Sequence, residues 1–140
     1  MLYHYTDAPG LAHLMRTGVL RAEDLVVRHR HLRLRRPLTW LTDDADPSSP
    51  AVRTVARLGR QAKITVRLTV STAYAQRWPI WVLDHRVSRR HLALVEEASE
   101  GFSDRLWVVQ QEIPWPQWII AEDLETRSVL WRVDLRAAAS

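Results

Sequence analysis

Alternating side chains mark the two clearest strands of this chain. Over residues 1–6 the alternation places His4 and Thr6 on one face of a strand and Tyr3 and Tyr5 on the other. Residues 63–70 alternate strictly between apolar and polar types. The core-facing positions of this second strand are Ile64, Val66, Leu68 and Val70, and Lys63, Thr65, Arg67 and Thr69 face away.

Two segments have the spacing and the end signals of helices. The first begins after an N-cap at Thr6 or Asp7, carries Pro9 in its first turn and ends at Gly18. Its predicted buried positions are Leu11, Leu14 and Met15. The second spans residues 87–99, with Ser88 as the N-cap and Gly101 just beyond its end. Residues 73–81 indicate no more than a short helical turn before Pro79.

The remaining apolar segments are short and predict strands rather than helices. They are residues 38–42, 105–113, 118–120 and 129–133, with a less regular extended segment at 24–34. The acids, serines and prolines of residues 43–50 predict an exposed loop. Together these elements predict a single α+β domain over residues 1–140, built on an antiparallel sheet with two or three helices.

Composition narrows the chemistry available to the chain. Of 140 residues, 46% are hydrophobic and 26% are charged, which is typical of a globular domain. There are no cysteines, so the sequence offers neither disulfides nor thiolate ligands. The four glycines form no Rossmann or P-loop phosphate motif, and the His29/His31 and His85/His91 pairs lack nearby carboxylates, so we expect no metal. With neither a membrane-length apolar run nor a signal-peptide pattern, we expect a cytoplasmic protein without membrane contact.

The formal charge is +4, and every basic residue except Lys63 is an arginine. Five arginines without an acid fall within residues 28–36, and they are Arg28, Arg30, Arg33, Arg35 and Arg36. This basic segment predicts a nucleic-acid-binding surface. The alternative is an ordinary solvated edge or loop.

The first eighteen residues carry the most specific pattern in the sequence. An aromatic residue, then His4, Tyr5 and Thr6, then a helix that stops at Gly18, resembles the opening of the ADP-ribosyltransferase superfamily, in particular its small bacterial His-Tyr-Glu and His-Tyr-Asp members. The resemblance implies the split antiparallel sheet of that superfamily and NAD as the substrate. It also implies that His4, Tyr5 and Thr6 hold the nicotinamide ribose. A strand histidine outside such a pattern is more often structural.

Later residues follow in the chain order that this resemblance requires. Trp40 stands where the family has a tyrosine and would stack on nicotinamide, with Thr42 beside it. Glu112 would be the catalytic carboxylate that stabilises the oxocarbenium-like ribose, with Gln110 on the same strand face. Arg67 would pair with the NAD pyrophosphate or simply face solvent. Three further acids compete with Glu112 for the catalytic role, and they are Glu96, Glu97 and Glu100.

The resemblance implies an NAD-dependent ADP-ribosyltransferase or NAD glycohydrolase, in the style of a toxin or phage-defence effector. Its acceptor would be a protein or a nucleic acid, and an antitoxin or immunity protein would be its partner. Two alternatives remain open. One is an enzyme like the RNA 2′-phosphotransferases, and the other is a non-catalytic module that binds a nucleotide or nucleic acid through the same cleft and the basic 28–36 segment.

Overall fold

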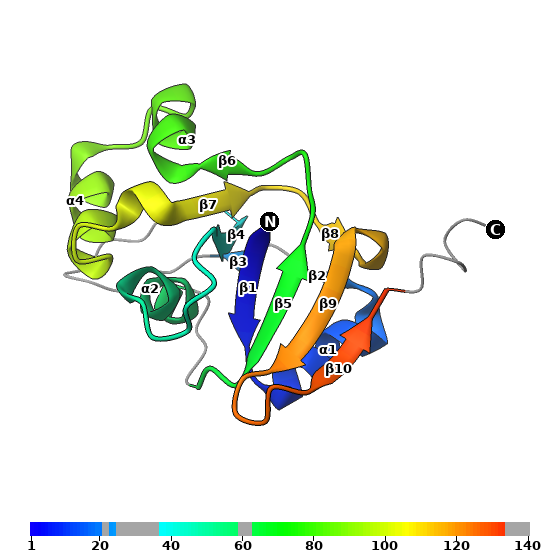
Figure 1. Ribbon diagram of the computed structural model, residues 1–140. Coiled ribbons are helices and arrows are strands. Elements are labelled where there is room, and N and C mark those ends of the chain that lie inside the picture. Colours follow the sequence, from blue (N-terminus) through cyan, green and yellow to red (C-terminus); the bar gives the residue numbers. More distant parts are fainter. Residues whose placement is uncertain (21–22, 25–36, 59–62, 134–140) are drawn as a thin grey trace.

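The computed structural model describes residues 1–20, 23–24, 37–58 and 63–133 as a small α+β domain (Figure 1). The strands are β1 (Leu2–Thr6), β2 (Val19–Leu20), β3 (Glu23–Asp24), β4 (Pro37–Thr42), β5 (Val66–Val70), β6 (Gln76–Arg77), β7 (Leu106–Val109), β8 (Ile113–Pro114), β9 (Trp118–Asp123) and β10 (Val129–Arg132). The α-helices are α1 (Ala8–Thr17), α2 (Pro50–Leu58), α3 (Trp78–Asp84) and α4 (Arg89–Ala98). Two 3-10 turns complete the set, η1 (Ser103–Arg105) and η2 (Trp115–Gln117).

One twisted sheet organises the molecule. Its strand order is β10-β9-β5-β1-β4-β7-β6, with β3 added beside β4, while β2 and β8 form a separate two-stranded sheet. Every pairing among the described strands is antiparallel, as the sequence predicts. The first strand therefore lies in the middle of the sheet, between β5 and β4.

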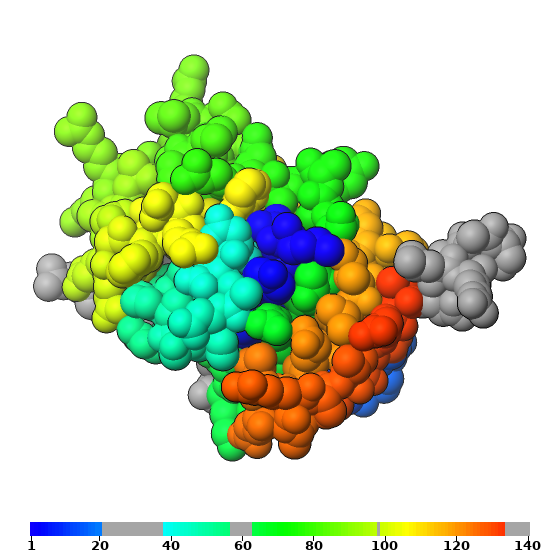
Figure 2. Space-filling model, viewed as in Figure 1, coloured from blue at the N-terminus to red at the C-terminus, as the bar shows by residue number. Residues whose placement is uncertain are grey.

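Two apolar cores lie on opposite faces of this sheet. On one face α1 packs Leu11 and Leu14 against Leu68 of β5 and its neighbours. At the other end of the sheet, on the opposite face, Trp40 of β4 packs with Trp78 and helices α2 to α4. The face of β1, β5 and β9 that points away from α1 carries no helix, and Figure 2 shows its side chains at the surface in a hollow.

Helix α1 has the N-cap and the C-terminal glycine that its sequence predicts. Asp7 is the N-cap, and its carboxylate accepts a hydrogen bond from the Gly10 amide at 2.8 Å. At the other end Gly18 adopts the left-handed conformation, with φ of 73°, and donates its amide to the Leu14 carbonyl. The prediction that Met15 is buried was wrong, because the side chain is 45% exposed and lies beside the stripe of Leu11 and Leu14.

The prediction of two or three helices was also wrong, because the described residues form four α-helices. Helix α2 follows the predicted exposed loop directly, where Ser49 accepts from the Val52 amide at 3.2 Å and Pro50 occupies the first turn. Helix α3 contains Pro79, which a first turn tolerates because its amide would have no helical partner. Both helices are short and begin at or next to a proline, and residues of this kind are also typical of loops.

A substitution at Gly10 tests the packing of α1 on β1. A Cβ atom at this position would collide with Oγ1 of the buried Thr6, although Gly10 has an ordinary helical backbone. Alanine normally stabilises a helix interior by about 0.5–1 kcal/mol. Here we expect Gly10→Ala to lower the free energy of unfolding by about 1–2 kcal/mol, measured by urea denaturation. In a Thr6→Ala background the same change should cost much less, and an equal cost in both backgrounds would contradict the collision.

Candidate functional site

The predicted site residues divide between the two faces of the sheet. Residue pairs that oppose one another across the strands share a face, and His4 pairs with Leu68 whereas Tyr5 pairs with Arg67. His4 and Thr6 therefore face α1, and Tyr5 and Arg67 face the helix-free side. On β4, Trp40 and Thr42 point to the same side of the sheet, because Thr42 pairs with Tyr3, but at Trp40 this side is covered by helices α2 to α4.

His4 is half-buried on the α1 side of the sheet, and its Nδ1 is enclosed. Burial lowers the pKa of its imidazole to about 4, and a hydrogen bond to the backbone of Trp40 acts in the opposite direction. Because Nδ1 has no partner, that hydrogen bond is made by Nε2. The ring is neutral at physiological pH, and it ties β1 to β4 on the α1 side of the sheet.

The lowered pKa of His4 predicts a pH-dependent stability. The unfolded chain binds this proton with an ordinary pKa of about 6.5, so protonation favours unfolding. The contribution is complete above about pH 6.5 and is lost as the pH falls toward 4. Between about pH 7.5 and 4, we expect the free energy of unfolding of the wild type to fall by roughly 2–3 kcal/mol more than that of His4→Gln, as measured by urea denaturation. Parallel curves for the two proteins would contradict a buried neutral ring.

Trp40 and Thr42 are both part of the core. Trp40 is 2% exposed, and its ring lies 5.0 Å from that of Trp78. A stacked nicotinamide would have to displace this contact. Thr42 is fully buried, donates to the Arg105 carbonyl at 2.9 Å and accepts from the Asp44 amide at 3.1 Å. These two side chains therefore hold β4 and the loop after it.

The predicted strand over residues 105–113 was wrong at its C-terminal half. Strand β7 ends at Val109, because the chain leaves the main sheet so that Ile113 and Pro114 can pair with β2. Gln110 and Glu112 consequently lie in an exposed connection and not side by side on a strand. The competing acids Glu96, Glu97 and Glu100 lie in or just after the last turn of α4. Of these, Glu100 pairs with Arg53 at 3.2 Å.

Arg67 is the centre of the helix-free face. It pairs across the sheet with Tyr5 of β1 on one side and with Glu122 of β9 on the other. Its Nη2 lies 3.2 Å from Oε1 of Glu122, and its guanidinium lies 5.5 Å from the centre of the Tyr3 ring. Burial lowers the pKa of Arg67, but the hydrogen bond and charge of Glu122 outweigh it and the pKa lies above its usual value. The row Tyr5–Arg67–Glu122 thus joins three neighbouring strands.

The loop after β4 is fastened to this row. Tyr5 donates its hydroxyl to the Asp44 carbonyl at 2.9 Å, and Arg67 donates Nη1 to the Ala45 carbonyl at 2.6 Å. Burial also raises the pKa of Tyr5 to about 12, so its hydroxyl stays protonated. The loop is therefore positioned from the sheet face itself.

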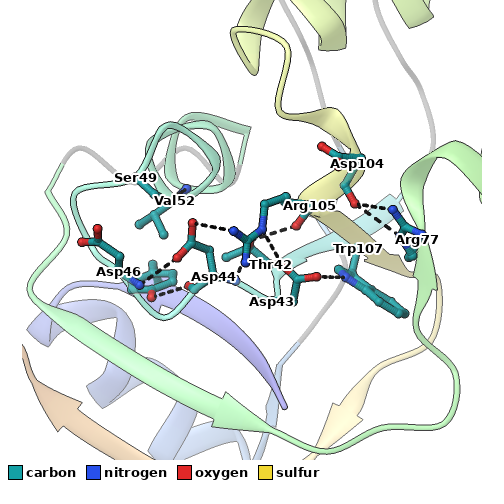
Figure 3. Close-up of polar contacts among 11 residues, drawn as sticks. Thr42, Asp43, Asp44, Asp46, Ser49, Val52, Arg77, Asp104, Arg105 and Trp107 are labelled. Carbon is teal, nitrogen blue, oxygen red and sulfur yellow. Dashed lines mark hydrogen bonds and ion pairs between the residues drawn. The ribbon is translucent and has the colours of Figure 1, made fainter.

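Arg105 fastens the same loop from the β7 side (Figure 3). Its Nε lies 2.9 Å from Oδ1 of Asp43, and its Nη1 lies 3.5 Å from Oδ2 of Asp44. Trp107 adds a hydrogen bond from its indole nitrogen to Asp43 at 3.3 Å. These carboxylates are occupied in holding the loop.

A hollow of about 370 Å³ opens beside the row. Its lining residues are Pro47, Arg67, Glu122, Asp123, Leu124 and Arg127. One wall is the anchored loop, and the other is the β9–β10 hairpin, drawn in orange in Figure 2. Two arginines and two carboxylates thus line one open place on the sheet, and the Tyr3 ring lies 5.5 Å from the guanidinium of one of them, Arg67. Such a group can bind an anion and stabilise a developing positive charge beside it.

No family model, curated protein or solved structure matches this chain. Within the described ranges, no group of three or more metal-binding side chains comes together. No helix in the same part of the chain is long and apolar enough to span a membrane. The basic segment at Arg28, Arg30, Arg33, Arg35 and Arg36 lies outside the described residues.

The sequence named Arg67, which borders the hollow, but not Glu122 or Tyr3, which lie beside it. The signal for Glu122 was present, because it ends an apolar strand, but nothing in the sequence indicates that β9 pairs with β5. Fifty-five positions separate Arg67 from Glu122. Tyr3 lies on the face of Tyr5, as the strand alternation predicts, whereas the resemblance implies a ligand contact on the opposite face, at His4 and Thr6.

Proposed function

We propose that the chain is an NAD-dependent ADP-ribosyltransferase or NAD glycohydrolase, and that its site is the open sheet face around Arg67 and Glu122. The observation that carries the proposal is the row Tyr5–Arg67–Glu122, which crosses three strands beside the hollow. The first eighteen residues resemble the opening of the ADP-ribosyltransferases, but in this proposal His4 and Thr6 do not take the ribose-binding role that the resemblance implies. The proposal moves the catalytic carboxylate from Glu112 to Glu122, and it moves the aromatic contact from Trp40 to Tyr3.

Arg67 supplies the anion-binding part of the site. Its contacts to the Ala45 carbonyl and to Glu122 hold the guanidinium in one orientation. A fixed, always charged guanidinium is suited to a pyrophosphate such as that of NAD. Tyr3 presents a half-buried ring beside it, on which a nicotinamide or adenine ring can stack.

Glu122 supplies the carboxylate. As the bond between nicotinamide and ribose breaks, the electron pair leaves with nicotinamide and positive charge develops on the sugar. A carboxylate held by Arg67 at the edge of the hollow stabilises that charge. It can also accept the proton that the incoming water or acceptor hydroxyl releases as it bonds to the ribose. His4 and Thr6 face α1, so in this proposal they position β1 and do not touch the substrate.

The experiment is an assay of nicotinamide release from NAD by the purified protein, with a calorimetric titration of NAD in parallel. We expect NAD binding together with release, which is hydrolysis when no acceptor is added. Binding without release in the presence of protein, DNA or RNA acceptors would favour the non-catalytic alternative. Release only with 2′-phosphorylated RNA would favour the phosphotransferase alternative. The absence of both NAD binding and nicotinamide release would overturn the proposal.

A further inference from the structure

A second charged surface lies far from the hollow, where α3 turns into α4. Residues 85–95 contain three arginines, two histidines and no acid. Arg86, Arg89 and Arg90 are all exposed, and we call them the α4 corner. Figure 1 places this part of the chain at the end of the molecule opposite β10, and in Figure 2 yellow-green side chains project from it into solvent.

The charges of the α4 corner are not neutralised within the described part of the protein. The ion pairs there engage Arg53, Arg67 and Arg105, and none of the three corner arginines takes part in one. The nearest acid in sequence, Asp84, instead accepts a hydrogen bond from Gln76 at 3.4 Å. The corner therefore presents three unpaired positive charges within five residues.

The charges of α4 run against its helix dipole. The N-terminal end of a helix carries partial positive charge, so acids stabilise it and bases destabilise it. Helix α4 has no acid in its first turn, which carries Arg89 and Arg90, and no base in its last turn, where Glu96 and Glu97 lie. This arrangement lowers helix stability and adds the helix field to that of the arginines. An arrangement that breaks a local stability rule is expected at functional sites.

We propose that the α4 corner binds the phosphate backbone of a single-stranded nucleic acid. Guanidinium groups bind phosphodiester oxygens in pairs. The partial positive charge at the start of α4, where Ser88 accepts from the His91 amide, adds to that attraction. Beside them the half-buried His85 stacks on Trp81 with ring centres 4.2 Å apart, so an aromatic pair of the kind that contacts unpaired bases adjoins the corner. The surface is independent of the hollow and of NAD, and its residues are distinct from the basic 28–36 segment.

The test measures anisotropy of a labelled oligouridylate with the wild type and two matched double variants. Arg89→Gln with Arg90→Gln removes two corner charges, and Arg16→Gln with Arg132→Gln removes two exposed charges elsewhere. At about 50 mM salt we expect the corner variant to bind about tenfold more weakly or worse, and the control variant to bind like the wild type. The slope of log affinity against log salt should fall by about 0.7 for each phosphate that the corner variant no longer neutralises.

A charge-reversed variant separates binding from folding. Arg89→Glu with Arg90→Glu places acids where the helix dipole favours them, so we expect an unchanged or higher melting temperature together with loss of RNA binding. Equal weakening by the corner and control variants would mean an effect of net charge alone and would overturn the proposal. So would the absence of RNA binding by the wild type, or binding to anionic phosphatidylserine vesicles in place of RNA.

Discussion

Replacing Glu122 with glutamine is expected to reduce nicotinamide release by about 100-fold or more. Glutamine keeps the size of the side chain, but it cannot stabilise positive charge on the ribose or accept a proton from the acceptor. It also removes the ion pair with Arg67, whose Nη2 lies 3.2 Å from Oε1. That pair is about a quarter exposed on each side, so its loss should change the free energy of unfolding by no more than about 1 kcal/mol. The measurement is initial rates with saturating NAD, beside a melting curve.

The matched control is Glu112→Gln, which makes the same chemical change at the exposed connection after β7. We expect this variant to release nicotinamide at a rate within about twofold of the wild-type rate. Glu112 lies outside the row, so its loss should leave the stabilisation of the transition state unchanged. The reverse pattern, with Glu112→Gln inactive and Glu122→Gln active, would return the catalytic role to Glu112. It would then also remove the row Tyr5–Arg67–Glu122 from the mechanism.

The sequence predicts the parts of the fold that depend on local signals. Helix α1 has an N-cap and a C-terminal glycine within its own segment, and both are observed. Strand β5 alternates clearly, and Val66, Leu68 and Val70 are buried as expected, although the strand begins at Val66 and not at Lys63. The pattern for α4, with Ser88 as N-cap, is also confirmed. In each case the deciding interactions lie within a few residues of one another.

The candidate site depends on strand register, which the sequence does not encode locally. Arg67 meets Glu122 only because β9 pairs with β5, and it meets Tyr5 only because β1 occupies the other side. Glu112 and Glu122 are both acids near the end of an apolar segment, so pattern alone could not choose between them. The choice turns on β7 ending at Val109, which follows from the pairing of Ile113 with Leu20.

The loop between β4 and α2 is held in part by residues of the row that borders the hollow. Its sequence predicted only exposure, yet Tyr5, Arg67 and Arg105 all hold it. Two of these residues belong to the row that borders the hollow. An anion that drew Arg67 away from the Ala45 carbonyl would release one of the three anchors. If NAD binds at the row as proposed, its binding and the position of the loop are therefore coupled through the Arg67 guanidinium.

Replacing Trp40 with alanine is expected to lower the free energy of unfolding by about 3–5 kcal/mol. The ring is 2% exposed, packs against Trp78 at 5.0 Å and belongs to the core beneath α2 to α4. Such a loss is a large part of the stability of a domain of this size. Urea denaturation measures this loss. The matched control is Trp115→Ala, because the Trp115 indole is 50% exposed and its removal should lower the free energy of unfolding by well under half as much.

The folded variant Trp40→Phe then separates a core role from a ligand contact. This variant should lower the free energy of unfolding by about 1–3 kcal/mol, because the smaller ring leaves part of the space of the indole unfilled. Its affinity for NAD should stay within about twofold of the wild type, since nothing on the open face is changed. A nicotinamide-stacking role predicts the opposite, with weakened NAD binding and little loss of stability. Because Trp40 and Arg67 point to the same side of the sheet but only Arg67 borders the hollow, measuring both quantities on one variant decides whether the substrate reaches the tryptophan core.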